Sequence, residues 1–364
     1  MKRLNIGIIG CGNISAIYLQ NLQAFEETEV IAVADLDLDR AKKRAEEYGI
    51  AHACTPDELL QLSDIELVVN LTVPKAHAAV CRQALESGKH VYVEKPLSVT
   101  VDEGESLVAL ARSKGLLLGC APDTFLGAGI QTCLELIRSG KIGRPLSATA
   151  FMLSKGHEHW HPAPHFYYEQ GGGPLYDMGP YYLTALVQLI GPIRRVSGSA
   201  AISFAERTVT SKEHYGEKIR VETPTHLTGT MEFVSGAVGT MIMSFDIMTP
   251  TQYPYIEIFG SEGTLRVPDP NTFSGPVLLR GKDNEDWQEI EVTHQYADNA
   301  RGIGVLDMAY AIRNSRLHRA NGSVALHVLE AMVGFHQAAE QGKHIELLRL
   351  CDAPQPLPKE GIVN

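Results

Sequence analysis

A glycine-rich turn close to the first residue constrains the fold most strongly. The apolar run Leu4–Ile9 leads directly into Gly10-Cys11-Gly12-Asn13-Ile14-Ser15, and an amphipathic stretch follows. In a dinucleotide fingerprint the first glycine permits a tight turn and the second lets the backbone approach a pyrophosphate. The helix that follows presents free N–H groups to the phosphates. With serine in the third glycine position, the pattern predicts a β–turn–α unit whose residues 10 to 14 bind a dinucleotide.

A carboxylate stands at the spacing expected for recognition of a ribose. Asp35 ends the second apolar run, 20 residues after Ser15. A carboxylate there can accept hydrogen bonds from both ribose hydroxyls of NAD and would repel the 2′-phosphate of NADP. Arg40 is nearby in the sequence and could hold that phosphate instead. NAD is therefore the predicted cofactor, with NADP possible.

Up to residue 122, short apolar runs alternate with amphipathic helical patterns. Continuous apolar strands separated by helices predict a parallel sheet that is covered on both faces. We expect a doubly wound α/β domain of the Rossmann type over residues 1–122. The predicted strands are 4–9, 30–34, 67–72, 90–93 and 116–120, and the predicted helices are 14–25, 39–48, 75–87 and 101–114.

The pattern changes after residue 122, where we place a second domain over residues 123–364. Its first part reads as a helix at 125–139, a strand at 146–154, a loop rich in His, Pro and Gly at 155–173, and an apolar helix at 175–190. From there to about residue 292, short strands follow one another without a long helix, which favours an antiparallel sheet. Helical patterns at 305–314 and 323–341 follow these strands. This domain is therefore a second α/β unit.

The charge balance argues against polyanionic partners. The chain has 32 basic and 43 acidic residues, a formal net charge of −11, and no basic run. Such a protein repels a phosphate backbone, so neither nucleic acid nor an anionic membrane is an expected partner. No apolar run reaches 18 residues, and the six cysteines are scattered without CxxC pairs. We expect reduced thiols in a soluble, cytoplasmic protein.

The segment Glu94-Lys95-Pro96 directly follows a buried-strand pattern. Ligands of open α/β sheets bind at the carboxyl ends of the strands. Partial burial lowers the pKa of a lysine and lets it exchange a proton with a developing alkoxide. Lys95 is therefore the predicted catalytic lysine, and a cis Lys95–Pro96 bond is expected. Seen alone, the same residue would read as a surface lysine at a strand end.

Taken together, the motifs resemble the Gfo/Idh/MocA family, named after glucose-fructose oxidoreductase, inositol dehydrogenase and a rhizopine catabolism protein. The resemblance implies hydride exchange between a sugar-like alcohol and nicotinamide, with Lys95 beside both. It also implies that Thr72, Pro74, His77 and Glu94 line the dinucleotide. The resembling segments are 10–14, Leu71-Thr72-Val73-Pro74 with His77, Glu94-Lys95-Pro96, and Gly171-Gly172-Gly173-Pro174-Leu175-Tyr176-Asp177-Met178-Gly179.

The resemblance further implies that the second domain carries a large open sheet, which in this family often joins subunits. We therefore expect a homodimer or homotetramer that associates through the C-terminal sheet. The expected small-molecule partner is a carbohydrate or polyol.

The sequence departs from the family pattern at one position. In much of the family a histidine follows the Asp of the last motif by four residues and acts as acid and base; here Tyr181 stands at that spacing from Asp177. On a helix the two side chains share a face. A nearby cation lowers a phenol's pKa, although tyrosine ordinarily titrates near ~10 and histidine near ~6.5. Asp177 and Tyr181 join Lys95 as predicted catalytic residues.

The missing imidazole has a possible source in the loop His157-Glu158-His159-Trp160-His161-Pro162-Ala163-Pro164-His165. One of its histidines takes over the acid–base role while Trp160 stacks on a sugar face, or the loop is a solvated lid. A third interpretation is a metal bound by alternate histidines of an extended segment. Hydride transfer to NAD needs no metal, so no metal site is predicted. His159, Trp160 and His161 are the expected substrate contacts.

Two polar residues begin the second domain. Asp123 and Thr124 follow the last Rossmann strand, where their side chains could bind substrate hydroxyls. Equally, either could cap the helix that is expected to begin at Phe125. They are included among the predicted substrate residues.

The sequence thus predicts an NAD-dependent oxidoreductase that acts on a secondary alcohol of a sugar, polyol or sugar derivative. Basic side chains are sparse between residues 123 and 182, which favours a neutral substrate over a phosphorylated or nucleotide-linked one. Two alternatives stay open. Tightly bound NAD could serve transient oxidation for glycoside cleavage or for hydride exchange between sugars. The fold could also carry a non-catalytic regulator that senses a sugar or dinucleotide.

Overall fold

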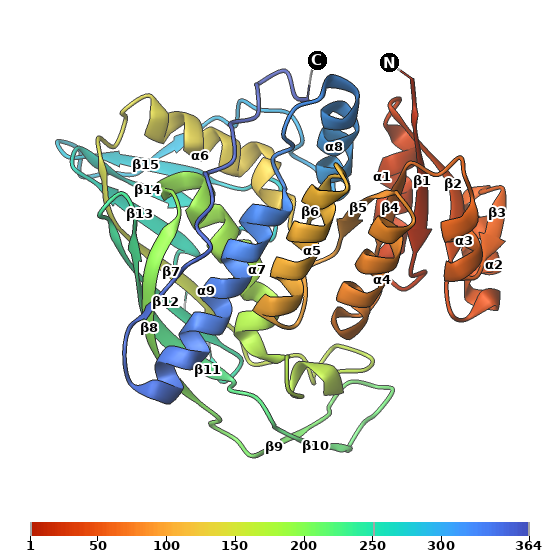
Figure 1. Cartoon of the computed structure of the whole chain (residues 1–364). Coiled ribbons are helices and arrows are strands. Elements are labelled where there is room, and N and C mark those ends of the chain that lie inside the picture. Colours follow the sequence, from red (N-terminus) through yellow and green to blue (C-terminus); the bar gives the residue numbers. More distant parts are fainter. Residues whose placement is uncertain (1, 250–251, 363–364) are drawn as a thin grey trace. The chain divides into compact units, whose positions relative to one another are not determined.

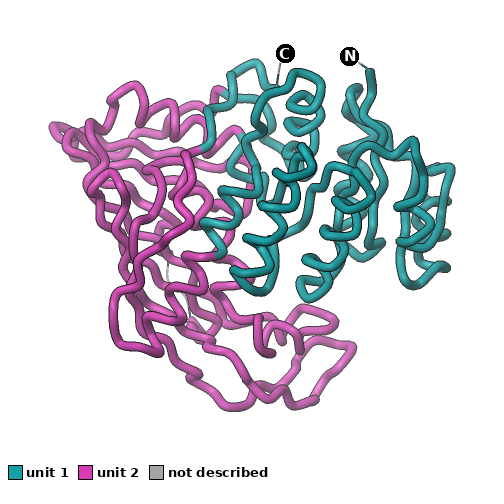
Figure 2. Tube along the Cα trace, viewed as in Figure 1, with its two compact units in different colours: residues 1–127, 294–329, 354–364 teal, residues 128–293, 330–353 magenta. Residues whose placement is uncertain are grey.

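The computed structural model describes residues 2–249 and 252–362, and they form two compact units (Figure 2). The first unit comprises residues 1–127, 294–329 and 354–364, and the second comprises residues 128–293 and 330–353. Residues 294–329 and 354–364 were expected in the second domain, yet they pack with the Rossmann unit. The composition of the sequence does not change where the chain passes from one unit to the other. The sequence therefore contains no signal for these boundaries, which tertiary packing sets.

The first unit is built on a six-stranded parallel sheet in the order β3-β2-β1-β4-β5-β6 (Figure 1). This confirms the predicted doubly wound Rossmann sheet. The β3 strand was not predicted, because it has only three residues and none of them is buried. The strands are β1 (Leu4–Ile9), β2 (Thr28–Ala34), β3 (His52–Cys54), β4 (Leu67–Asn70), β5 (His90–Val93) and β6 (Leu118–Cys120).

Helix boundaries in the first unit follow from local capping. Thr55 and Thr100 each form a capping box with a glutamate three residues later, and Asp37 accepts a hydrogen bond from the N–H of Arg40. Such caps satisfy the free N–H groups of a first turn. The helices are α1 (Ser15–Ala24), α2 (Leu38–Tyr48), α3 (Pro56–Gln61), α4 (Pro74–Glu86), α5 (Val101–Ser113) and α8 (Ile303–Asn314), with the short 3-10 helix η1 (Thr124–Leu126).

The second unit contains a nine-stranded mixed sheet in the order β16-β15-β14-β13-β7-β12-β11-β8-β17. The neighbours pair antiparallel except β12 and β7, which are parallel, so the prediction of a mainly antiparallel sheet is confirmed. The strands are β7 (Pro145–Leu153), β8 (Ile193–Ala201), β11 (His226–Phe233), β12 (Val238–Ser244), β13 (Ile256–Gly260), β14 (Gly263–Val267), β15 (Val277–Gly281), β16 (Gln288–Ile290) and β17 (Ile345–Glu346).

Helices cover one face of this sheet. In the second unit, α6 packs on β14 and β15, and α7 packs on β7, β11 and β12 (Figure 1). Phe335 of α9 fits against Gly229, where an added Cβ would lie 2.5 Å from the ring. The helices are α6 (Ala128–Arg138), α7 (Gly173–Ile190) and α9 (Gly322–Gln341), with the 3-10 helix η2 (His165–Tyr167); a separate hairpin pairs β9 (Glu206–Thr208) with β10 (Lys218–Arg220).

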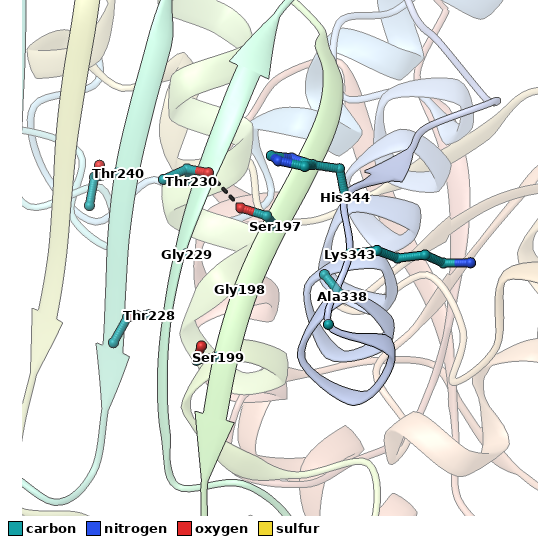
Figure 3. A pocket seen from close by; sticks show the side chains of 11 residues that line it. Ser197, Gly198, Ser199, Thr228, Gly229, Thr230, Thr240, Ala338, Lys343 and His344 are labelled. Carbon is teal, nitrogen blue, oxygen red and sulfur yellow. Dashed lines mark hydrogen bonds between the residues drawn. The ribbon is translucent and has the colours of Figure 1, made fainter.

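On the other face of the sheet, β8 and β11 carry small hydroxylated side chains next to the Arg195–Glu232 ion pair. On β11, Leu227 and Met231 are buried, whereas Thr228 and Thr230 alternate with them on the outer side. Thr230 and Ser197 share a 2.7 Å hydrogen bond at an open hollow of about 420 Å³ (Figure 3). None of the predicted site residues lines this hollow.

Candidate active site

The turn between β1 and α1 is open to a ligand at Gly12 and closed at Gly10. Gly10 has φ +104, and a Cβ there would lie 2.7 Å from the Leu71 carbonyl group, so only glycine fits. A Cβ on Gly12 would meet no described atom within 4 Å. The backbone from Gly12 to Ile14 is therefore accessible at a helix N-terminus, whereas Gly10 and Cys11 are buried, and this arrangement suits the pyrophosphate of a dinucleotide.

Asp35 lies at the carboxyl end of β2 and contacts the glycine turn directly. Its Oδ2 accepts a hydrogen bond from the N–H of Cys11 at 2.8 Å, and its Oδ1 accepts one from the N–H of Asp37 at 3.0 Å. A carboxylate has about four acceptor positions, so capacity remains for ribose hydroxyls. The Arg40 guanidinium lies 3.4 Å from Oδ1, which places the cation beside the carboxylate as the sequence suggested.

Additional residues at this sheet edge were missed by the sequence analysis. Arg44 donates a hydrogen bond to the Gly12 carbonyl at 3.3 Å. Leu36 is 94% exposed and Val73 is 67% exposed, although both are apolar. Apolar side chains exposed beside a ligand edge are candidates to cover a flat ring such as adenine. The signal in the sequence was their position directly after β2 and β4.

His77 stands behind the loops that follow β4 and β5. Its side chain is wholly buried; Nδ1 lies 2.6 Å from the Pro96 carbonyl oxygen and Nε2 lies 3.0 Å from the Thr72 carbonyl oxygen. Burial lowers its pKa, against an opposing effect of both carbonyls. The ring therefore ties two loops together, while Thr72 and Pro74 are on the side of these loops that solvent reaches.

Glu94 and Lys95 follow β5 at the carboxyl edge of the parallel sheet. The Glu94 carboxylate accepts hydrogen bonds from the Tyr18 hydroxyl at 2.7 Å and from the Lys95 N–H at 2.9 Å. Lys95 is half-buried, and the Lys95–Pro96 bond is cis, as predicted. Tyr18, which the sequence analysis did not single out, thus orients the residue next to the lysine.

Asp123 and Thr124 lie in the interior of the first unit. The Asp123 carboxylate accepts hydrogen bonds from the N–H groups of Gly302 at 2.8 Å and Gly304 at 3.0 Å. The sequence predicted that this carboxylate would bind substrate or cap the helix that follows it. It instead caps α8, makes no capping hydrogen bond to η1, and is too buried to contact a substrate. Burial raises its pKa to about 6, despite the opposing effect of these two hydrogen bonds. Thr124 is 1% exposed and likewise unavailable to a substrate.

In the second unit, Asp177 has an imidazole partner that comes from the histidine-rich loop. Nε2 of His157 lies 3.1 Å from Oδ2 of Asp177, and both side chains are largely buried. Asp177 is on α7, one turn before Tyr181, which is 9% exposed. The loop had been recognised by its density of imidazoles, but His157 was not among its three expected site residues.

Aromatic rings surround this pair. The His157 ring lies 4.1 Å from that of Tyr167, 4.7 Å from that of Phe245 and 5.3 Å from that of Trp160, measured between centroids. Trp160 is 55% exposed, so its indole is available to a sugar face. His159 is exposed and His161 is half-buried; burial lowers the pKa of both.

A buried ion-pair network anchors the loop. The Arg207 guanidinium lies 3.0 Å from the Glu158 carboxylate and 3.5 Å from that of Asp246, and all three side chains are almost wholly buried. Tyr168 donates its hydroxyl hydrogen to Glu158, and its oxygen accepts a hydrogen bond from the His157 N–H at 3.2 Å. The sequence offered no signal for this network, because its members are far apart along the chain.

Within residues 2–249 and 252–362, no three His, Cys, Asp or Glu side chains are grouped as metal ligands. No described helix combines the length and apolar character that crossing a membrane requires.

The parallel sheet, the glycine turn and the carboxylate after β2 define an oxidoreductase with a dinucleotide-binding Rossmann fold. The model of an oxidoreductase family with an NAD-binding Rossmann fold matches residues 4–121, and that of the GFO/IDH/MocA C-terminal domain matches residues 130–266. The chain therefore belongs to the Gfo/Idh/MocA oxidoreductase family, as its motifs indicated, and its cofactor is NAD.

Several relatives with assigned activities are similar over most of the chain. A dTDP-3,4-didehydro-2,6-dideoxy-alpha-D-glucose 3-reductase of Streptomyces antibioticus is 30% identical, over 85% of this chain and 89% of the relative. The myo-inositol 2-dehydrogenase of Thermotoga maritima is 25% identical, over 72% and 74%. A solved levoglucosan dehydrogenase in complex with NADH and L-sorbose aligns with a TM-score of 0.83 at 20% identity, over 98% and 100%, which shows the shared fold.

Proposed function

We propose that this enzyme interconverts a secondary alcohol and a ketone of a sugar, polyol or sugar derivative, with NAD as the redox partner. The observation that carries the proposal is the placement of Lys95. Its backbone follows β5 at the same sheet edge as the glycine turn, and Glu94 holds its N–H. Named activities of the relatives, including an inositol dehydrogenase and a sugar reductase, support an alcohol or ketone substrate.

Residues of the first unit form a set that could hold the cofactor. The turn from Gly10 to Ile14 presents its backbone to a pyrophosphate, and Asp35 offers acceptors to a ribose. Thr72, Pro74 and Glu94 follow neighbouring strands at the same edge. Bound NAD supplies a two-electron oxidant, and its reduced form supplies the reductant.

Lys95 acts on the reacting oxygen. Its ammonium group stabilises the negative charge that develops when an alcohol loses its proton, or donates a hydrogen bond when a ketone is reduced. Asp177 assists by orienting the acid–base group, which is Tyr181 or a histidine of the loop. Trp160 stacks on the sugar, and His159 and His161 bind its hydroxyls.

A neutral sugar suits these residues better than a nucleotide-linked one. Recognition of a diphosphate normally uses arginine forks. In the second unit, Arg207 is beside the histidine-rich loop. Its guanidinium is almost wholly buried and already forms ion pairs with Glu158 and Asp246. The binding loop is instead rich in aromatic rings and imidazoles.

We also propose that the outer face of the nine-stranded sheet joins copies of this chain. Small side chains, among them Ser197, Thr230 and Thr240, form most of the surface around the hollow, and Lys343 and His344 also line it (Figure 3). Light scattering after gel filtration should give the mass of a dimer or tetramer. A mass of one chain at micromolar concentration would contradict this assembly.

A cofactor-coupled screen tests the proposed activity. Formation of NADH should be followed with levoglucosan, myo-inositol, free hexoses and methyl glycosides, with NADP in parallel, and a dTDP-linked hexose as the charged comparison. We expect turnover on at least one neutral compound with NAD. Absence of NADH formation, together with cofactor that stays bound through gel filtration, would favour the transient-oxidation alternative. Activity confined to the dTDP-sugar would contradict the neutral-substrate proposal.

A further inference from the structure

Asp177 is paired with a histidine of the loop, whereas position 181 of α7 is a tyrosine. His157 is 20 residues from Asp177 in sequence, yet its Nε2 lies 3.1 Å from Oδ2 of that carboxylate. Both side chains belong to the second unit, and they are 14% and 16% exposed. The structure therefore pairs Asp177 with an imidazole of the loop, which the sequence left open as an alternative to Tyr181.

The two ring nitrogens of His157 are in different surroundings. A carboxylate beside Nε2 favours the tautomer that carries hydrogen on this nitrogen, because an ionised carboxylate only accepts hydrogen bonds. The lone pair is then on Nδ1, which is buried and has no hydrogen-bond partner among the described residues. One nitrogen bonded to a carboxylate and the other without a hydrogen-bond partner among the described residues is the pattern of a general base with its orienting group.

The surrounding structure limits movement of the ring. Tyr167 and Phe245 pack against it, and the Tyr168 hydroxyl accepts a hydrogen bond from its backbone N–H. The next residue in the chain, Glu158, is held by Arg207. An acid–base group must keep its geometry through the reaction, and these contacts provide that preorganisation.

We propose that His157, oriented by Asp177, is the acid–base residue of this enzyme and fills the role that the family motif would place at position 181. The inference rests on the proposed sugar oxidation. In that direction, His157 takes the hydroxyl proton and the C–O bond becomes C=O, and bound NAD would be the oxidant that accepts the C–H hydrogen with its electron pair. His157 then returns the proton to solvent. In ketone reduction, the same imidazole donates the proton.

The choice of His157 over Tyr181 follows from proton affinity. General acid–base catalysis is most effective when the group titrates near the working pH, which is true of an imidazole. A phenol ordinarily titrates near ~10 and needs a cation to bring it into range. The titratable and charged groups near the ring are Asp177 from α7 and Tyr167 from η2, with Tyr168, Glu158 and its partner Arg207 on the backbone side, and His159 and His161 from the loop.

Kinetics distinguishes the two residues. His157→Gln and Asp177→Asn should be compared with Tyr181→Phe, and His52→Gln, at an exposed position of β3 in the first unit, serves as the control. The probe is levoglucosan with NAD, or 1,5-anhydro-D-fructose with NADH if only reduction is detected. We expect His157→Gln to reduce kcat about 10²–10³-fold and to remove the acidic limb of the pH profile. The Kd of NADH for His157→Gln, measured by fluorescence, should stay within about threefold of the wild-type value.

Asp177→Asn, which preserves the shape of the side chain, should reduce kcat less while shifting the same limb. Added imidazole should partly restore turnover to His157→Ala. The proposal is overturned if His157→Gln keeps its pH profile and most of its kcat while Tyr181→Phe loses both. Wild-type protein inactive on every sugar, with NADH still bound, would contradict the proposed activity instead.

A spectroscopic readout tests the pair without turnover. Long-range ¹H–¹⁵N NMR of protein with labelled histidines reports which ring nitrogen carries hydrogen. We expect His157, assigned by its loss in His157→Gln, to show the Nε2–H tautomer at neutral pH and to lose that preference in Asp177→Asn. A signal with the hydrogen on Nδ1 would contradict the proposed arrangement, whatever the substrate is.

Discussion

The carboxylate of Asp35 accepts a 2.8 Å hydrogen bond from the backbone N–H of Cys11, and this bond ties the end of β2 to the glycine turn. The proposed ribose acceptor therefore also shapes the glycine turn. The Arg40 guanidinium, 3.4 Å away, is held by the same carboxylate. We therefore expect nucleotide choice to depend on the balance between the Asp35 charge and this cation.

Replacement of Asp35 by Ala should weaken NAD binding about 10- to 100-fold, because it removes two ribose hydrogen bonds of a charged acceptor. The same change releases Arg40 and removes the repulsion of a 2′-phosphate, so NADP binding should improve. Calorimetry with both nucleotides measures the two effects. Asp39→Asn, at an exposed position of α2, is the matched control. Equal losses for NAD and NADP would mean that Asp35 acts only on the shape of the turn.

Lys95→Met should reduce kcat by about 10²–10⁴-fold while the Kd of NAD changes by no more than about threefold. The substitution removes the ammonium group near the reacting oxygen and keeps the half-buried aliphatic stem. Stopped-flow formation of NADH and equilibrium binding separate the two constants. Lys43→Met, at an exposed position on α2, should retain full activity. Unchanged turnover of Lys95→Met would exclude a catalytic role for this lysine.

Arg207→Leu should lower stability by about 3–5 kcal/mol, because the change leaves the buried Glu158 and Asp246 carboxylates without their cation. Thermal unfolding measures the loss. Hydrogen exchange should accelerate in residues 156–172, which the network anchors. Arg220→Leu provides the comparison, since that side chain is 87% exposed and should change stability by less than about 0.5 kcal/mol. Similar melting temperatures for both variants would show that the network contributes little.

Asp123 should make the first unit less stable as pH rises from about 4 to above 6. Its folded pKa is about 6 against an ordinary 3.8, so the folded state binds the proton more tightly and loses that advantage as pH passes 6. Asp123→Asn is neutral throughout. Relative to wild type it should gain about 1–2 kcal/mol between pH 5 and pH 8. Denaturant midpoints at both pH values measure this gain. Asp39→Asn, the control, should show no gain. If the stability difference between Asp123→Asn and wild type were the same at both pH values, burial would not be the dominant cause of the raised pKa.

Local patterns predicted much of the first unit. The strands at 4–9 and 90–93 have the predicted bounds, because a short apolar run followed by a turn signal is a strong local feature. The β3 strand was missed because it is short and unburied. In the second unit, β16 and β17 are equally short and unburied, and each is placed by pairing with a neighbouring strand.

Sequence alone determined the glycine turn, the carboxylate after β2 and the position of Lys95 after β5, since each follows from residues that are adjacent or one βαβ unit apart. Only the tertiary structure decided which groups these side chains meet. Asp123 finds its partners 179 and 181 residues away, and Asp177 finds its imidazole across a loop. The physical reason is that backbone preference acts over a few residues, whereas the partner of a buried polar side chain is set by the packing of distant segments.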